Sequence, residues 1–403
     1  GADGMLYLLS RDGAPRKKIL RLSTESPDLA AAAVVVPETE AVLQSFAPAA
    51  SRLYAIEMDG GPTRLRVLDL EGRDLGVAPL GEVASVSGLT RLDGDRVLVR
   101  RESYVDPPAW FEHDAGWEAP RTTALVSTSP ADFSDHEARR VFATADDGVK
   151  IPIDVLFRKG TPLDGSAPLL LYAYGSYGIS QRPGFRATRV VWTEQGGISA
   201  TACVRGGGEY GDEWHRAAAR EKKKRSMEDL AACARFLVEE GYTTRDRLAL
   251  EGGSAGGLLV YGTMALEPDA AAAVVSHVGI ADAIRSEFSP NGEFNITEFG
   301  TVKDETEFRG MIEYSPYHQI RDGVAYPAVL SLTGINDPRV EPWQPFKMTA
   351  RLQAAGSPNP VLLRISMKSG HGGGSLSQRE ERAVDVYSFL FDRLGIEYRP
   401  AAR

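Results

Sequence analysis

A serine flanked by glycines stands in the run 252–256, which reads Gly-Gly-Ser-Ala-Gly. The run directly follows the apolar segment 248–250 and opens the apolar stretch 257–260. A tight corner between a strand and a helix requires glycines beside the serine to avoid backbone clashes, and it exposes the serine hydroxyl at the sheet edge. The pattern predicts that Ser254 is a nucleophile; the alternative is a structural glycine-rich turn.

A serine nucleophile needs a base, and three of the six histidines follow Ser254 in the sequence. His277 lies in an apolar stretch, which favours a packed side chain. His318 belongs to the run 314–318 and indicates a loop or a helix cap. His371 follows the last apolar segment and stands among glycines, in a loop that can carry an imidazole to the serine. We therefore expect His371 to be the base.

The base in turn needs a carboxylate that orients it. In α/β-hydrolases the chain order is serine, acid, histidine, and the acid follows a strand. Asp337 comes just after the apolar segment 329–334, whereas Asp282 and Asp304 follow no such segment and Asp322 precedes it. The position predicts Asp337 as the acid; the alternative is a turn residue before a proline.

The segment from residue 128 onward alternates short apolar runs with longer amphipathic stretches. Strands that alternate with helices indicate a mostly parallel sheet with helices on both faces. We therefore expect an α/β-hydrolase domain over 128–403. The predicted strands lie near 151–157, 169–172, 197–204, 248–250, 273–275, 328–332 and 361–365, and the predicted helices near 226–240, 256–266, 342–355 and 377–394.

Residues 1–127 carry a different pattern, with short alternating strands joined by Asp-Gly and Gly-Pro turns. The segment 6–22 is repeated 47 residues later, and a weaker third copy begins near Val97. This spacing is typical of β-propeller blades, the alternative being a β-sandwich. Two or three blades cannot close a ring, so we expect the propeller to be incomplete in this chain, which reads as a fragment or as a sequence without its beginning.

The composition is that of a globular protein, with 403 residues, 43% hydrophobic and 25% charged. A net charge of −9 argues against nucleic acid or an anionic membrane as partner, and no apolar run is long enough to cross a membrane. Two cysteines form neither a disulfide framework nor a zinc site. We expect no metal and no cofactor, and a monomer. The compartment stays open, with a lean toward the cytoplasm, or the periplasm if a signal peptide lies upstream.

Five motifs occur in an order that resembles the prolyl oligopeptidase family of serine peptidases, with the oligopeptidase B branch as a more distant relative. The resemblance covers 128–403, and the blade repeats fit the propeller of that family. The motifs are Tyr-Ala-Tyr-Gly-Ser-Tyr-Gly at 172–178, Arg-Gly-Gly-Gly-Glu-Tyr-Gly at 205–211, the serine corner at 252–256, Asp-Pro-Arg-Val at 337–340, and Ser-Gly-His-Gly at 369–372.

The resemblance implies roles beyond the triad of Ser254, Asp337 and His371. Tyr174 matches the tyrosine whose hydroxyl forms the oxyanion hole together with the backbone N–H of Ala255, and its alternative is packing at a strand end. Arg339 matches the arginine that holds a substrate carbonyl, and its alternative is a surface ion pair.

The resemblance also implies an apolar pocket for the residue before the scissile bond. Its matching positions are Tyr177, Ile280, Phe299 and Val340, while Asn295 stands where prolyl-specific members have a stacking tryptophan. Phe294 could supply a ring if the backbone shifts by one residue. In oligopeptidase B an acidic pair holds a basic side chain, but the matching positions are Asn295 and Thr297, with Glu293 and Glu298 as weaker candidates nearby.

Two further runs favour structural roles. The run 205–209 lacks the Lys-Ser/Thr of a phosphate-binding loop and indicates a tight turn near the site. The basic run 222–225 predicts a solvated loop or helix start. The sequence as a whole predicts a serine oligopeptidase that cuts short peptides after proline or another small apolar residue. The alternatives are an esterase on the same triad, and an inactive fragment or binding module.

Overall fold

The computed structural model describes residues 1 and 3–400, which divide into two compact units. Unit 1 comprises Gly1–Ser134, Arg182–Ala187 and Glu209–Glu213. Unit 2 comprises Asp135–Gln181, Thr188–Gly208 and Trp214–Arg403. Each unit has a hydrophobic core of its own, so each is described by itself.

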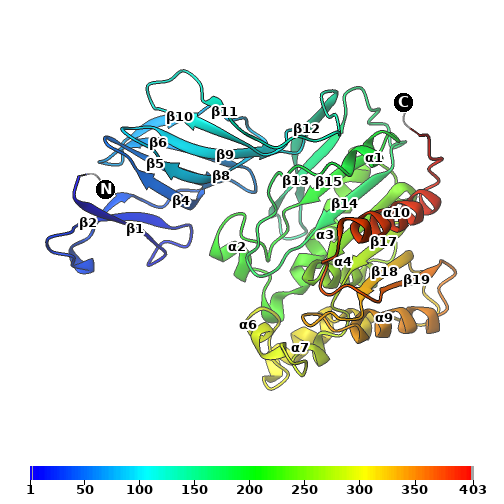
Figure 1. The fold of residues 1–403 in the computed structure, drawn as a ribbon. Helices are drawn as coiled ribbons and strands as arrows, with labels where there is room; N and C mark the ends of the chain where they lie inside the picture. The colour runs from blue at the N-terminus through cyan, green and yellow to red at the C-terminus, as the bar shows by residue number, and fades with distance from the viewer. Residues whose placement is uncertain (2, 401–403) are drawn as a thin grey trace. The chain divides into compact units, whose positions relative to one another are not determined.

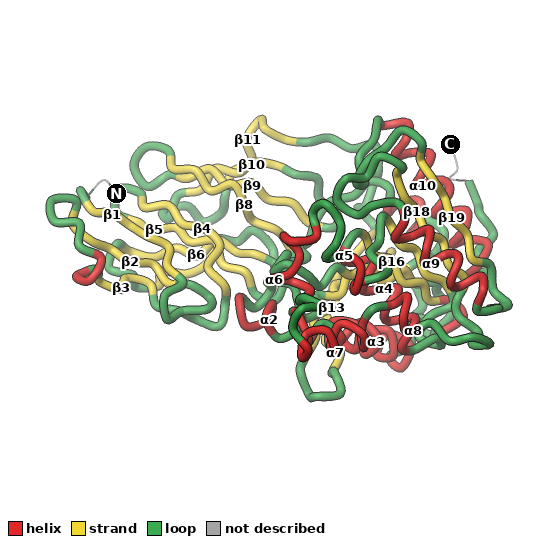
Figure 2. Tube along the Cα trace, turned by 90° about the horizontal axis from the view of Figure 1, so that it is seen from below, coloured by secondary structure: helices red, strands yellow, loops and turns green. Residues whose placement is uncertain are grey.

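Unit 1 is built from three antiparallel sheets, each a meander of strands that follow one another in the chain. In Figure 2 these strands are yellow, and the only helix among the described residues of Gly1–Ser134 is η1 (Leu29–Ala31). The sheets are β1 (Met5–Ser10), β2 (Lys18–Ser23) and β3 (Ala33–Val36); β4 (Val42–Pro48), β5 (Arg52–Met58), β6 (Thr63–Asp69) and β7 (Asp74–Val77); and β8 (Ala84–Arg91), β9 (Val97–Ser103), β10 (Ala109–His113) and β11 (Arg121–Val126).

The repeat seen in the sequence is the repeat of these sheets. The hairpins β1–β2, β5–β6 and β9–β10 occupy equivalent positions, with β5 starting 47 residues after β1. Tyr54, Ile56, Leu65 and Val67 point into one core between sheets, and Leu53 and Leu68 into another, because successive strand residues face opposite sides. Four-stranded meanders of this kind are propeller blades, which confirms the predicted architecture.

Unit 2 is organised around one eight-stranded mixed sheet (Figure 1). From β14 onward the neighbouring strands run parallel, whereas β12 and β13 join the sheet edge antiparallel. The strand order is β12 (His136–Thr144), β13 (Lys150–Arg158), β15 (Ile198–Ala202), β14 (Leu169–Ala173), β16 (Leu248–Gly253), β17 (Ala273–His277), β18 (Ala328–Gly334) and β19 (Val361–Ser366).

Helices cover both faces of this sheet, as predicted. One face packs against the cluster that contains α3, α4 and α9, and the other against α1 and α10, the latter red in Figure 1. The helices are α1 (Arg189–Thr193), α2 (Asp212–Arg216), α3 (Lys224–Glu239), α4 (Ala255–Leu266), α5 (Ala283–Ser286), α6 (Ile296–Phe299), α7 (Glu305–Tyr314), α8 (Pro316–Gln319), α9 (Trp343–Ala354) and α10 (Leu376–Arg393), with single 3₁₀ turns η2 (Arg220–Lys222), η3 (Arg245–Arg247) and η4 (Gly292–Asn295).

The central strands are apolar throughout because both of their faces are buried. Leu248 and Leu250 of β16 contribute to one core cluster, and Ala249 between them contributes to the other. Val274 and Val275 of β17 divide in the same way. Because these strands run parallel, their carboxyl ends lie at one edge of the sheet, which is where an open α/β sheet carries its site.

Candidate active site

Ser254 stands at the corner between β16 and α4, with a φ of 57° and a ψ of −118°. A non-glycine residue in this region is strained, and such strain persists only where neighbours enforce it. A Cβ on Gly252 would lie 2.1 Å from the carbonyl oxygen of Gly256, and one on Gly256 would lie 2.8 Å from the carbonyl oxygen of Ala173. Glycine is therefore required on both sides of the serine.

The backbone around Ser254 is fixed by hydrogen bonds to both neighbouring segments. Its N–H donates to the carbonyl of His277 at 2.7 Å, and its own carbonyl accepts from Gly257 at 2.9 Å. Ala255 is the first residue of α4, where a helical N–H has no intrahelical acceptor. The corner thus presents a hydroxyl beside a helix N-terminus that favours negative charge.

Asp337 follows β18, and its carboxylate is buried. One oxygen, Oδ1, accepts the N–H groups of Arg339 at 2.9 Å and Val340 at 3.0 Å. The other oxygen, Oδ2, lies 2.7 Å from Nδ1 of His371. Burial pushes the pKa of Asp337 up, but the hydrogen bonds from His371 and from the two N–H groups hold it below its ordinary value. Asp337 is therefore an ionised carboxylate, and each of its two oxygens faces at least one donor.

His371 lies in the loop between β19 and α10, and its side chain is 13% exposed. Because Nδ1 faces Asp337, the opposite ring nitrogen, Nε2, is free to face a substrate or a serine. In the described part of the chain no hydrogen bond joins His371 to Ser254. Hydrogen bonds of this kind are often long before substrate binds and shorten in the complex.

Tyr174 follows β14 and packs against the serine corner, since a Cβ on Gly256 would come within 3.3 Å of its Cα. Burial, with the neighbouring Tyr172 and Glu298, raises the pKa of Tyr174 to about 12, while Arg339 and a hydrogen bond with Ser254 act in the opposite direction. The phenol therefore stays protonated at neutral pH and can donate a hydrogen bond next to Ser254.

Two of the predicted pocket residues are aromatic rings in contact with each other. Tyr177 meets Phe299 edge-on, with ring centroids 5.5 Å apart and planes at 78°. The Tyr177 hydroxyl donates to Oδ1 of Asn295 at 2.8 Å. Ile280 and Val340 are both buried. The N–H of Ile280 donates to the carbonyl of Ser254 at 3.4 Å, and the N–H of Val340 donates to Asp337 at 3.0 Å, so the two residues lie beside the serine and the acid.

Arg339 is exposed, and it makes no ion pair within the described residues. Its positive charge acts to lower the pKa of Tyr174 and of Tyr177, although burial raises both values overall. The guanidinium is therefore close enough to both hydroxyls to interact with them. The alternative role of Arg339, a surface ion pair, is thus not found among the described residues.

Two expectations about nearby residues are wrong, and a third is confirmed in part. Phe294 is 83% exposed and supplies no ring to the pocket. Glu298 is 2% exposed and already bound to other side chains, so it does not present a free carboxylate to a basic substrate. The basic run 222–225 does start helix α3, but Lys223 within it is 2% exposed rather than solvated.

The other candidate bases and acids that follow Ser254 in the sequence are bound to partners outside the Asp337–His371 pair. Nε2 of His277 lies 2.8 Å from Glu251, and Nδ1 of His318 lies 2.9 Å from the hydroxyl of Ser315. Asp282 and Asp304 cap the N-termini of α5 and α7, and Asp322 pairs with Arg351.

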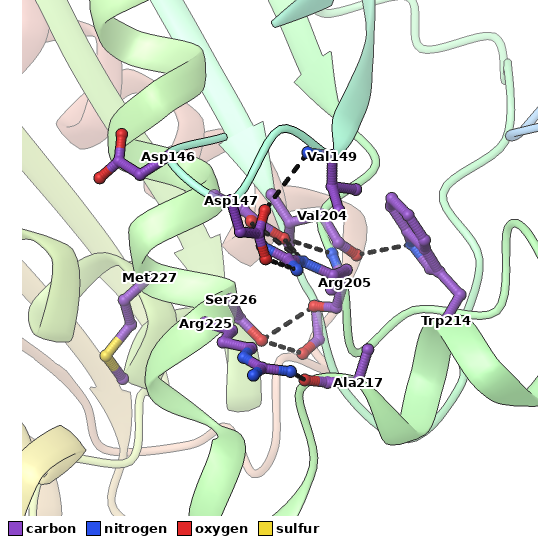
Figure 3. Close-up of polar contacts among 12 residues, drawn as sticks. Asp146, Asp147, Val149, Val204, Arg205, Trp214, Ala217, Arg225, Ser226 and Met227 are labelled. Carbon is purple, nitrogen blue, oxygen red and sulfur yellow. Dashed lines mark hydrogen bonds and ion pairs between the residues drawn. The ribbon is translucent and has the colours of Figure 1, made fainter. Parts of the chain in front are cut away.

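The buried side chain of Arg205 supports the glycine-rich turn beside the site, and nothing in the sequence marks this arginine as the centre of an ion-pair group. Arg205 donates to Asp229 through its backbone N–H, Nε and Nη2, and its Nη1 faces Asp147 (Figure 3). The Ser226 hydroxyl donates to the carbonyl of Arg205 at 2.8 Å and to that of Gly175 at 3.3 Å. The turn is therefore tied to the loop that follows Tyr174.

Two kinds of feature are absent from the described residues. No group of three or more histidine, cysteine, aspartate or glutamate side chains in residues 1 and 3–400 is placed to hold a metal ion. No helix in the same part of the chain is both long and apolar enough to cross a membrane.

Comparison with family models gives two matches that together span most of the chain. The model described as the prolyl oligopeptidase family matches residues 183–397. The model described as the prolyl oligopeptidase N-terminal β-propeller domain matches residues 2–123.

Individual proteins and solved structures agree with these matches. The chain is 32% identical to a prolyl endopeptidase from Elizabethkingia meningoseptica over 97% of this chain and 56% of that protein. A solved prolyl endopeptidase superposes with a TM-score of 0.91 at 34% identity, covering 98% of this chain and 59% of the other. Oligopeptidase B from Leishmania major gives 0.87 at 27% identity, over 97% and 57%. The chain thus spans somewhat more than half the length of these relatives.

Proposed function

Since the chain belongs to the prolyl oligopeptidase family of serine peptidases, we propose that it hydrolyses short peptides through an acyl-enzyme on Ser254. The observation that carries the proposal is the convergence of Ser254, the Asp337–His371 pair and Tyr174 at the ends of β16, β18, β19 and β14. We further propose residues 1–127 as the propeller part and 128–403 as the peptidase domain.

The first half of the reaction forms the acyl-enzyme. His371 Nε2 takes the proton of the Ser254 hydroxyl while Oγ attacks the peptide carbonyl carbon. The negative charge that develops on the carbonyl oxygen accepts hydrogen bonds from the Tyr174 hydroxyl and the Ala255 N–H. His371 then gives its proton to the departing amine nitrogen as the C–N bond breaks, which leaves an ester on Ser254.

The second half returns the enzyme to its starting state. Water loses a proton to His371 Nε2 and attacks the ester carbonyl, and the same two donors stabilise the new oxyanion. His371 returns the proton to the Ser254 oxygen as the acid product leaves. Asp337 keeps the imidazole oriented through Nδ1 and stabilises its positive form throughout.

Specificity after proline or another small apolar residue is proposed from the pocket. The edge-to-face rings of Tyr177 and Phe299, together with Ile280 and Val340, are the apolar side chains that we propose to line it. Asn295 at the edge of this pocket is polar and bonded to Tyr177, so one wall lacks an aromatic face. Arg339, exposed and near both tyrosine hydroxyls, is proposed to hold a substrate carbonyl.

Cleavage of short chromogenic peptides tests the proposal. Substrates with Pro, Ala, Phe or Arg before the scissile bond should give the highest kcat/KM for Pro or Ala, and Ser254→Ala should abolish turnover of all four. A preference for Arg would refute the specificity, and turnover by Ser254→Ala would refute the mechanism.

An esterase on the same triad is a second candidate, favoured by the polar Asn295 where an aromatic wall would grip the substrate. Matched ester and amide substrates decide between the two, because turnover of the esters alone would favour the esterase. Failure of the folded protein to turn over either class would favour a binding module or an inactive fragment.

A further inference from the structure

A buried group of three charged or titratable side chains lies beside the loop that follows Tyr174. Nζ of Lys223 is 2.6 Å from Oε1 of Glu298, and Nε2 of His215 is 2.6 Å from Oε2 of the same carboxylate. Lys223 and Glu298 are each 2% exposed, and His215 is 25% exposed. Removing two charges from water costs several kcal/mol for each, so such a pair needs complete hydrogen bonding to persist.

The hydrogen bonds of this group extend to the backbone of the loop. Nζ of Lys223 also donates to the carbonyl of Gly175 at 2.7 Å, and the backbone N–H of Tyr177 is among the groups that lower the pKa of Glu298. Gly175 and Tyr177 both have positive φ, 61° and 57°. The second value is unfavourable for a tyrosine, so the loop conformation depends on contacts that enforce it.

We propose that Lys223 and Glu298 are positioning residues, which hold the turn 174–178 so that the Tyr174 hydroxyl faces Ser254 and the Tyr177 ring faces Phe299. The proposal rests on the function proposed above. Neither residue acts on the substrate directly. Lys223 binds the carbonyl of Gly175, the residue after Tyr174, and Glu298 holds the Lys223 ammonium in place while its neighbour Phe299 contacts the Tyr177 ring.

Glu298 is suited to this task because it is held as a carboxylate. Burial opposes its ionisation, but hydrogen bonds from His215 and Lys223 hold the pKa of Glu298 below its ordinary value. A carboxylate is a stronger acceptor for the Lys223 ammonium and the His215 ring than a neutral acid is. Glu298 also lies next to Phe299, so the same short helix α6 carries the anchor and the pocket ring.

The glycine-rich turn that contains Arg205 also contacts the backbone of the turn 174–178. Gly178 donates its N–H to the carbonyl of Gly206 at 3.0 Å, and a Cβ on Gly206 would lie 2.1 Å from the carbonyl oxygen of Gly175. Ser226, labelled in Figure 3, shares that carbonyl with Lys223. Because this support remains when the ion pair is removed, the loop should shift slightly and not unfold.

The test removes both charges together with side chains of similar size, as Lys223→Met/Glu298→Gln. Replacing a buried pair in this way often leaves stability unchanged, whereas removing one partner leaves a buried charge alone. The matched control is Arg140→Met/Asp154→Asn, which removes another largely buried pair, 2.8 Å apart, between β12 and β13.

Hydrogen exchange of the segment 172–178 is the first measurement, and it needs no turnover. We expect exchange at least tenfold faster in the Lys223/Glu298 variant, with no change in the Arg140/Asp154 control. Unchanged exchange in the first variant, or equal acceleration in the control, would overturn the positioning role whether or not the wild-type protein cleaves peptides. Absence of wild-type cleavage would instead count against the proposed function.

Kinetics in two backgrounds supply the second measurement. The Lys223/Glu298 variant should lower kcat about tenfold, but it should lower kcat much less when Tyr174→Phe has already removed the hydroxyl. Additive losses in kcat would overturn the proposal, because independent sites add and coupled ones do not. If the double variant fails to fold, His215→Ala, which buries no new charge, should accelerate exchange in the same segment by a smaller factor; no acceleration would again overturn the proposal.

Discussion

Asp337 binds His371 through one carboxylate oxygen and the backbone of residues 339 and 340 through the other. The imidazole is therefore oriented by a group that is itself fixed on both sides. This contact fixes the Nδ1 side of the ring, whereas Nε2 makes no hydrogen bond within the described residues.

Replacing Asp337 by asparagine should lower kcat by about 10³–10⁴-fold, because an amide can favour the wrong imidazole tautomer at this position. The measurement is kcat with a chromogenic peptide at neutral pH. Asn336→Ala, one residue earlier and exposed, is the control and should stay within a few-fold of wild type. A loss below tenfold in Asp337→Asn would contradict the assignment of the acid.

The same carboxylate predicts how stability depends on pH. Because its folded pKa lies below the ordinary value of 3.8, Asp337 contributes stability that is fully present above about pH 5 and is lost as the pH falls through the folded pKa. The gap in unfolding free energy between wild type and Asp337→Asn should therefore narrow on acidification below pH 4. Denaturant unfolding between pH 3 and pH 7 measures it, and a gap that widens in acid would show the opposite sign.

Tyr174→Phe should reduce kcat by about 10²–10³-fold with little change in KM, since one of two oxyanion donors is removed while ground-state contacts stay. The phenol pKa of about 12 means that the wild-type donor is present across the neutral range. Tyr172→Phe, two residues earlier on β14, is the matched control. Equal losses in both variants would show that Tyr174 acts through packing alone.

Neighbouring glycines at the serine corner should differ in their tolerance of a methyl group. Gly252→Ala places Cβ 2.1 Å from a backbone oxygen and should destabilise the fold by more than about 2 kcal/mol. Gly253→Ala places Cβ no closer than 3.6 Å to any neighbour and should cost less than about 1 kcal/mol. Equilibrium unfolding in urea compares them, and equal stability would contradict the geometry of the corner.

Asn295→Trp should raise the preference for proline. A ring at this position gives the missing apolar wall, and aromatic contacts add about 0.5–1.5 kcal/mol, so the ratio of kcat/KM for Pro over Ala should rise about two- to tenfold. Asn295→Ala removes the hydrogen bond to Tyr177 without adding a ring, and its ratio should stay near that of wild type. A rise in Asn295→Ala as well would mean that the hydrogen bond, and not the absent ring, limits selectivity.

The helices, the blade repeat and the order of the site residues could be predicted from the sequence because each depends on a pattern within a short stretch of chain. The helices predicted at 226–240 and 377–394 end within two residues of α3 and α10, and the 47-residue repeat is the blade repeat. The order of serine, acid and histidine follows from the order of strands β16, β18 and β19 at one sheet edge.

The Lys223–Glu298 pair could not be read in this way. Its members are 75 residues apart, and nothing in a run of four basic residues marks one of them as buried. Exposure of a charged side chain depends on which elements cover it, which only the tertiary structure determines. The same reason explains why Glu298, in sequence a weaker candidate for holding a basic substrate side chain, faces His215 and Lys223 instead.

The outward growth of the sheet from β16 through β17 and β18 to β19 has a consequence for biosynthesis. A nascent chain that folds as it emerges from the ribosome would hold the serine corner early, yet it would lack the base until β19 and the loop bearing His371 had been made. The proposed catalysis would therefore begin only after the segment that carries His371 has been translated, and shorter nascent chains would lack its base.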